Sequence, residues 1–129
     1  MPRILIVDDD HDLIEGQREF LSARGYEVQT ACSMSDGLAK LEVFAPDLII
    51  ADLMMEHYDT GFVFCKKVRD RPGLARVPII MQTAAPREIG FTLDAYDEKA
   101  RGWMKVDEIL TKPVPLEDLV GKIEQHLAR

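Results

Sequence analysis

Short apolar runs that end at a carboxylate constrain the fold of this chain more than any other feature. Leu48–Ala51 has no polar break and stops at Asp52, and Ile4–Val7 stops at Asp8 in the same way. An unbroken apolar run of this length is typical of a strand buried on both faces, as in a parallel sheet covered by helices. Asp52 and Asp8 would then stand at the carboxyl ends of strands, where open α/β sheets bind ligands.

Strand and helix patterns alternate five times along the chain. Strands are predicted over residues 4–7, 27–31, 48–51, 78–81 and 109–111. The predicted helices are one that stops at Gly25, one capped by Ser33 or Ser35 and ended by Pro46, one from Gly61 to about Arg71, one over 86–104, and one over 116–127. Strict alternation predicts an α/β fold with right-handed crossovers. We expect a doubly wound five-stranded parallel sheet in the order 2-1-3-4-5, the flavodoxin-like arrangement.

Size and composition bound the class of protein. The 129 residues suffice for one domain, expected to span 1–129, and the net charge of -7 argues against direct nucleic-acid binding. No apolar run approaches the roughly 20 residues that span a bilayer, and no signal peptide is expected at the start. Cys32 and Cys65 form no CxxC pair, which indicates reduced thiols and a cytoplasmic location.

The predicted topology brings polar side chains from four strand ends into one crevice. Asp8, Asp9 and Asp52 would repel one another there by about 1 to 4 kcal/mol per pair at ~4 Å, so a cation is needed. Oxygen ligands of this kind favour Mg²⁺. Thr83 and Lys112 would follow the fourth and fifth strands, and a hydroxyl beside an ammonium suits an anion. Together these groups predict transfer of a phosphoryl group onto a carboxylate.

Four short motifs, each at a predicted strand end, resemble the receiver domain of two-component response regulators. They are Asp8-Asp9-Asp10, Asp52-Leu53-Met54-Met55, Thr83-Ala84 and Lys112-Pro113. The resemblance covers essentially the whole chain. It implies a signalling protein, not an enzyme, with intrinsic Mg²⁺-dependent autophosphorylation and autodephosphorylation. Its expected phosphodonor is a sensor histidine kinase or a phosphotransfer protein.

The resemblance also implies a role for each residue of the crevice. Asp52 would be the phosphoacceptor and, with Asp8, Asp9 and the backbone carbonyl of Met54, would hold the metal. Thr83 would donate a hydrogen bond to the phosphoryl group, and Lys112 would pair with it. The Lys112–Pro113 peptide bond is expected to be cis. Apolar Met54 and Ala85 beside the site imply slow self-dephosphorylation.

The chain departs from the family's pattern at several positions. Ile109 stands where the family usually has an aromatic switch residue, and Thr60 lengthens the loop after Asp52 by one residue. The segment between Thr83 and Lys112 is also longer than usual. We therefore regard the 86–108 segment, which contains Phe91 and Trp103, as the candidate surface for an unknown downstream partner.

Two other functions fit parts of the sequence. A haloacid-dehalogenase-type phosphatase would use Asp8 as nucleophile, but Asp52 would then have no role and no second acidic pair follows Lys112 on a strand. A receiver-like interaction module without phosphorylation would explain Ile109, but it would not explain why all five site residues are present. Asp10 is expected to be a helix cap or a surface residue and not a metal ligand, and His11 and His126 are expected on helix surfaces.

Overall fold

Five parallel strands form the centre of the fold, in the predicted order β2-β1-β3-β4-β5. The computed structural model describes residues 1–52, 55, 60–83 and 106–128. The strands are β1 (Arg3–Val7), β2 (Glu27–Ala31), β3 (Leu48–Asp52), β4 (Ile79–Thr83) and β5 (Glu108–Thr111). Every neighbouring pair is parallel, which confirms the topology expected from the strict alternation.

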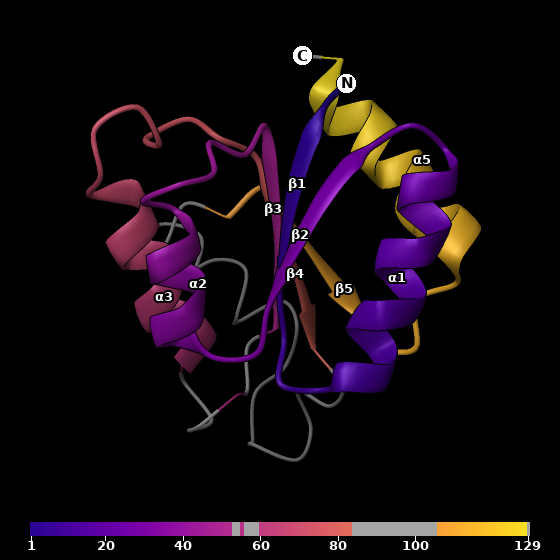
Figure 1. Ribbon diagram of the computed structural model, residues 1–129, viewed down its shortest axis with the longest axis horizontal. Coiled ribbons are helices and arrows are strands. Elements are labelled where there is room, and N and C mark those ends of the chain that lie inside the picture. The colour runs from indigo at the N-terminus through magenta and orange to yellow at the C-terminus, as the bar shows by residue number, and fades with distance from the viewer. Residues whose placement is uncertain (53–54, 56–59, 84–105, 129) are drawn as a thin grey trace.

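Helices cover both faces of the sheet. They are α1 (His11–Ala23), α2 (Met34–Lys40), α3 (Thr60–Arg69) and α5 (Leu116–Leu127). Figure 1 shows α1 and α5 on one face and α2 and α3 on the other. All residues of β3 and β4 are therefore buried. The doubly wound fold is confirmed, whereas the predicted helix over 86–104 lies outside the described residues.

Side chains that alternate along each strand divide the core in two. Leu5, Ile49 and Met81 pack with α3 residues such as Phe64, and Ile6, Ile50 and Ile80 pack against α1 and α5. This division is the direct consequence of the period-two geometry of a strand. It also decides the face from which each residue near the carboxyl ends of the strands leaves the sheet.

Local sequence accounts for several helix ends. The Asp10 carboxylate caps α1 by accepting a hydrogen bond from the Leu13 N–H at 3.1 Å. Of the two candidate caps of α2, Ser33 is the one used, and its hydroxyl accepts from the Asp36 N–H at 3.1 Å. The chain leaves α1 through Gly25, whose φ of 97° is strained for any residue with a Cβ.

Three predicted boundaries were wrong by a few residues. Helix α2 ends at Lys40, not near Pro46, because the N–H groups of Glu42 and Val43 bond to carbonyls three residues back and tighten the chain into turns. Helix α3 ends at Arg69 instead of near Arg71. Strand β4 continues through Thr83, since its last two residues pair with β3 and β5.

Gly37 allows α2 to approach the sheet closely. A Cβ at this position would lie 3.0 Å from Phe64 Cε1 and 3.1 Å from Val7 Cγ2, and both neighbours are fully buried. We expect Gly37→Ala to destabilise the protein by about 1–3 kcal/mol, as overpacking does. Gly16→Ala in α1 is the control: nothing lies within 4 Å of its Cβ, so a gain of about 0.5–1 kcal/mol is expected. Urea unfolding of both variants measures the difference, and a stabilised Gly37→Ala would contradict the packing described.

His126 corrects a prediction, because it is only 6% exposed instead of lying on the surface. It lies three residues after Ile123 and so faces the sheet with Leu119 and Ile123. Its Nε2 lies 3.0 Å from Glu108 Oε1 on β5 and must donate, since a carboxylate only accepts. His11, by contrast, is exposed as predicted.

The Glu108–His126 contact makes stability depend on pH. Burial raises the pKa of Glu108, but the His126 hydrogen bond and the Lys122 charge outweigh burial and lower it below 4.5. A lowered folded-state pKa stabilises above the unfolded value and loses its effect as pH falls through the folded value. We expect Glu108→Gln to cost about 1 kcal/mol at pH 7, with the difference from wild type shrinking as pH falls through the lowered pKa of Glu108. Denaturant titrations from pH 7 into the acid range measure this, with exposed Glu124→Gln as control; a difference that does not shrink as pH falls would contradict it.

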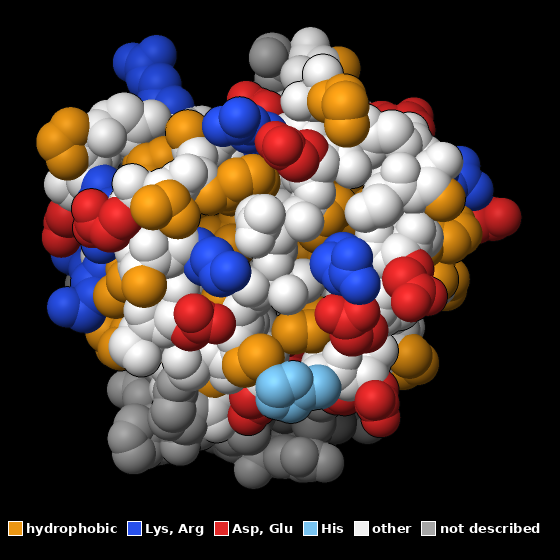
Figure 2. All heavy atoms as spheres, viewed as in Figure 1, with side chains coloured by type: hydrophobic (Ala, Val, Ile, Leu, Met, Phe, Trp, Pro, Cys, Tyr) orange, Lys and Arg blue, Asp and Glu red, His pale blue; other side chains and the backbone are white. Residues whose placement is uncertain are grey.

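The surface over α1, β2 and α2 carries mixed charge. Figure 2 shows Lys and Arg side chains interspersed with Asp and Glu on this face, with no continuous basic area. Among the helices of the described residues, none has both the length and the apolar character needed to cross a bilayer. Cys32 and Cys65 form no disulfide.

Candidate functional site

Three carboxylates meet at the carboxyl ends of β1 and β3. Asp8 and Asp9 follow β1, Asp52 is the last residue of β3, and one oxygen from each lies within 4.8 Å of the others. Asp8 and Asp52 are only 1% and 5% exposed, whereas Asp9 faces solvent. The structure thus brings together residues far apart in sequence, as the strand order required. Asp10, the fourth acidic candidate, is used as the α1 cap.

Lys112 joins this cluster from the end of β5. Its Nζ lies 2.7 Å from Asp8 Oδ2 and 3.5 Å from Asp52 Oδ2. Burial alone would lower the pKa of Lys112, but the hydrogen bond to Asp8 and the charges of Asp52 and Asp8 outweigh it, so the net shift is upward. Lys112 is therefore a cation at neutral pH and holds two acidic residues at once. The Lys112–Pro113 peptide bond is cis, as predicted.

Thr83 supplies a hydroxyl without a partner. It is fully buried at the end of β4, and its Oγ1 makes no hydrogen bond among the described residues. The backbone around it is fixed, because Thr83 pairs with Thr111 and its carbonyl accepts from the Lys112 N–H at 2.8 Å. A buried hydroxyl without a partner costs about 1–3 kcal/mol, so a hydrogen-bonding group from outside the described residues would stabilise it.

The cluster suits a hard cation and an anion together. Its donors to a metal are all carboxylate oxygens, the ligand type that divalent cations of the Mg²⁺ and Ca²⁺ class prefer. One ammonium opposes three carboxylates, so a further positive charge would relieve their repulsion. Thr83 and Lys112 offer donors to an anion beside that cation.

Several predicted site features lie outside the described residues: Met54, Ala84, Ala85, Phe91 and Trp103. Ile109 is described and half-buried, packing against the core on the α2 and α3 face of the sheet. Gln82 was missed as a candidate. The sequence signal that could have found it is a polar residue inside an otherwise apolar run, directly before Thr83.

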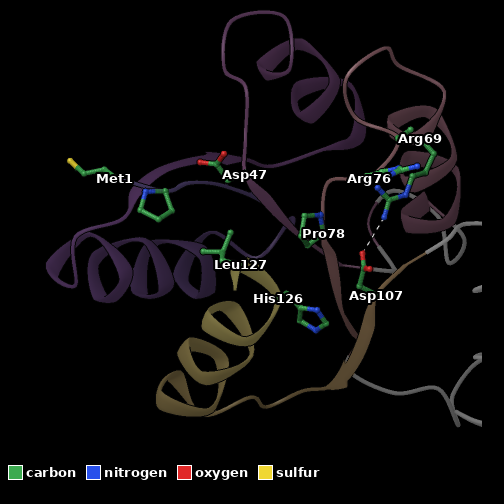
Figure 3. A pocket seen from close by; sticks show the side chains of 10 residues that line it. Met1, Asp47, Arg69, Arg76, Pro78, Asp107, His126 and Leu127 are labelled. Carbon is green, nitrogen blue, oxygen red and sulfur yellow. Dashed lines mark hydrogen bonds and ion pairs between the residues drawn. The ribbon is translucent and has the colours of Figure 1, made fainter. Parts of the chain in front are cut away.

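A cavity lies at the opposite end of the sheet, near the amino ends of the strands. Its volume is about 1000 Å³, and its lining residues are Met1, Pro2, Asp47, Arg69, Ala75, Arg76, Pro78, Asp107, His126 and Leu127. Figure 3 shows Arg69 and Asp107 paired on its wall. Asp47 accepts from the Arg3 N–H at 2.7 Å. Asp47 and Asp107 therefore bond to other segments of the chain. The acidic residues at the carboxyl ends of β1 and β3, by contrast, lie close to one another.

Comparison with known proteins identifies the family. The sequence matches the response regulator receiver domain over residues 4–124, and the chain therefore belongs to the receiver domains of response regulators. Its fold is also that of solved receivers. Chemotaxis response regulator CheY4 of Vibrio cholerae has a TM-score of 0.82 at 29% identity, covering 98% of both chains. A putative response regulator from Chloroflexus aurantiacus has a TM-score of 0.83 at 32% identity, covering 100% of both chains.

Two related regulatory proteins are longer than this chain. The DNA-binding dual master transcriptional regulator RpaA of Synechocystis is 35% identical over 129 residues, which are 100% of this chain and 50% of that protein. The phosphate regulon transcriptional regulatory protein PhoB of Rhizobium meliloti is 32% identical over 130 residues, covering 100% of this chain and 53% of that protein. The chain thus spans about half the length of these relatives.

Proposed function

We propose that residues 1–129 form a single receiver domain that accepts a phosphoryl group on Asp52 and signals through the resulting change in conformation. The observation that carries this proposal is the joint placement of Asp52, the acidic pair Asp8 and Asp9, the ammonium of Lys112 and the unpartnered hydroxyl of Thr83. Membership of the receiver family supports it. The donor would be a sensor histidine kinase or a phosphotransfer protein.

The carboxylates of Asp8, Asp9 and Asp52 would hold Mg²⁺, with the Met54 carbonyl as a further ligand. When bound, the ion would neutralise the negative charge that otherwise keeps an anionic donor away from the carboxylates. The all-oxygen donor set fits this ion. The haloacid-dehalogenase alternative is less well supported, because it gives Asp52 no role.

The chain's own residues would act on the phosphoryl group as follows. An Asp52 oxygen forms the new bond to phosphorus while the bond from phosphorus to the donor breaks and the donor leaves. Lys112, already within 3.5 Å of Asp52, would neutralise charge on the transferred group. The Thr83 hydroxyl would donate to one of its oxygens and gain the partner that it lacks. A new hydrogen bond made only in the phosphorylated form shifts the population between two conformations.

The output of this switch would pass to a protein partner, with the 86–108 segment as the proposed surface. Slow self-dephosphorylation and the absence of direct nucleic-acid contact by this chain stay predictions, as does the cytoplasmic location.

The two competing functions predict different results. A phosphatase would turn over an aryl phosphate continuously in dependence on Asp8, and an inactive module would neither bind Mg²⁺ nor become labelled.

The test is labelling with ³²P-acetyl phosphate, with Mg²⁺ or with EDTA. We expect one acid- and base-labile phosphate per chain, formed only with Mg²⁺ and lost over minutes or longer. The melting temperature should also rise with Mg²⁺, because a hundredfold excess of the ion over Kd increases the free energy of unfolding by about 2.7 kcal/mol. Absence of both the label and the Mg²⁺ shift would reject the proposal, and steady release of phosphate from an aryl phosphate would favour the phosphatase.

A further inference from the structure

Two glutamines form a buried amide pair directly behind the phosphorylation site. Gln17 on α1 and Gln82 on β4 are each only 1% exposed. The Gln17 Nε2 donates to Gln82 Oε1 at 3.1 Å, and the Gln82 Nε2 donates to Gln17 Oε1 at 3.4 Å. Their surroundings are apolar, since Ile14, Ile50 and Ile80 belong to the core on this face of the sheet.

Gln82 is the lateral neighbour of Asp52. The two residues are paired in the β3–β4 ladder, so their side chains leave the sheet on the same face. Gln82 is also the residue before Thr83, whose side chain leaves on the other face. Fixing the Gln82 amide therefore fixes the backbone that carries the unpartnered Thr83 hydroxyl beside Asp52.

The pair connects α1, the helix that follows the acidic pair, to β4, the strand that pairs with β3. Helix α1 begins two residues after Asp9, and β4 ends in Thr83. Stability alone does not require amides here. Two apolar side chains of similar shape would fill the same space with little or no loss, because hydrogen bonds inside the protein only replace hydrogen bonds to water. A reciprocal pair, however, allows one relative position of α1 and β4 and resists others.

We propose that Gln82, held by Gln17, is a positioning residue of the phosphorylation site: the pair sets the place of the carboxyl end of β4, and with it the distance from the Thr83 hydroxyl to the phosphoryl group on Asp52. This inference rests on the role proposed for Thr83. It predicts a rate effect that passes through Thr83 and leaves the metal ligands, which lie on β1 and β3, unchanged.

The test uses the double variant Gln17→Met/Gln82→Met, which keeps the side-chain volume and leaves no amide without a partner. We expect it to melt close to wild type and to keep its Mg²⁺ Kd within about twofold by calorimetry. Its labelling by acetyl phosphate at saturating Mg²⁺ should be about tenfold slower, since a misplacement of roughly 1 Å can cost up to about a hundredfold. Gln17→Leu/Gln82→Leu is a second variant that also removes both amides. Ile80→Val is the control for a mild packing loss on the same face of β4, and its labelling rate should match that of wild type.

A double-mutant cycle with Thr83→Val isolates the mechanism. If Gln82 acts through Thr83, the methionine pair should slow labelling in the Thr83 background and have no further effect in the Thr83→Val background. Equal rates for the methionine pair and wild type, additive effects with Thr83→Val, or a parallel loss of Mg²⁺ affinity would each overturn the inference. Failure of wild type itself to become labelled would instead reject the proposed function.

Discussion

Asp52→Asn is expected to reduce labelling by acetyl phosphate to background without unfolding the protein. The substitution keeps the shape of the side chain but removes the proposed nucleophilic carboxylate, and the neighbouring Asp8 is held by Lys112 at 2.7 Å. Asp52→Asn also removes the repulsion between Asp52 and its two acidic neighbours, and it removes one attraction to Lys112. The two lost repulsions outweigh the one lost attraction. Without Mg²⁺ we therefore expect stability to rise by about 1 kcal/mol. The Mg²⁺-induced rise in melting temperature should shrink, because one metal ligand is weakened.

Asp10→Asn is the matched control for this variant. Asp10 lies next to the acidic pair but is exposed and caps α1, and asparagine caps helices as well as aspartate does. Its labelling rate should match wild type. Labelling is measured by phosphoprotein gels and intact mass, and stability by urea unfolding with EDTA. Undiminished labelling of Asp52→Asn would show that the phosphoacceptor lies elsewhere.

The site was predictable from the sequence because its geometry follows from topology. Apolar runs marked β1, β3 and β4 as buried strands, and strict alternation fixed the order in which their carboxyl ends meet. Asp8, Asp52, Thr83 and Lys112 each follow or end such a strand, so their neighbourhood required no knowledge of side-chain packing. The same reasoning located the Asp10 cap from residue type alone.

Features that depend on partners distant in the sequence were not predictable in this way. The Gln17–Gln82 pair joins residues 65 positions apart, and no local pattern shows that two amides will meet. His126 was expected to face solvent because histidine is polar, yet Glu108 on β5 provides it with a buried partner. The early end of α2 depends on turns that only the folded chain displays. In each case tertiary contacts override the local preference.

Arg69 is the clearest such case, and its removal is expected to cause the largest loss of stability. Arg69 lies in the last turn of α3, where an exposed basic side chain would complement the negative end of the helix dipole. Instead its side chain is 8% exposed and joins three segments: Nη1 donates to the carbonyl of Val77 at 2.6 Å and to that of Leu74 at 3.2 Å, and Nη2 lies 3.2 Å from Asp107 Oδ2. The same Asp107 oxygen accepts from the Ile79 N–H at 2.9 Å, so this contact also anchors the start of β4.

Arg69→Ala should therefore cost about 3 kcal/mol, near the lower limit for a buried ion pair because Asp107 is 21% exposed, and lower the melting temperature by about 10 °C. Arg69→Lys should recover only part of this, because an ammonium cannot reproduce the planar fork that serves three acceptors. Arg71→Ala is the control: its partner Glu42 is 69% exposed, so a loss of about 0.5 kcal/mol is expected. Because Arg69 and Asp52 lie at opposite ends of the sheet, labelling per folded molecule should stay at the wild-type rate. A loss below about 1 kcal/mol for Arg69→Ala would show that these hydrogen bonds do not hold together the segments around the start of β4.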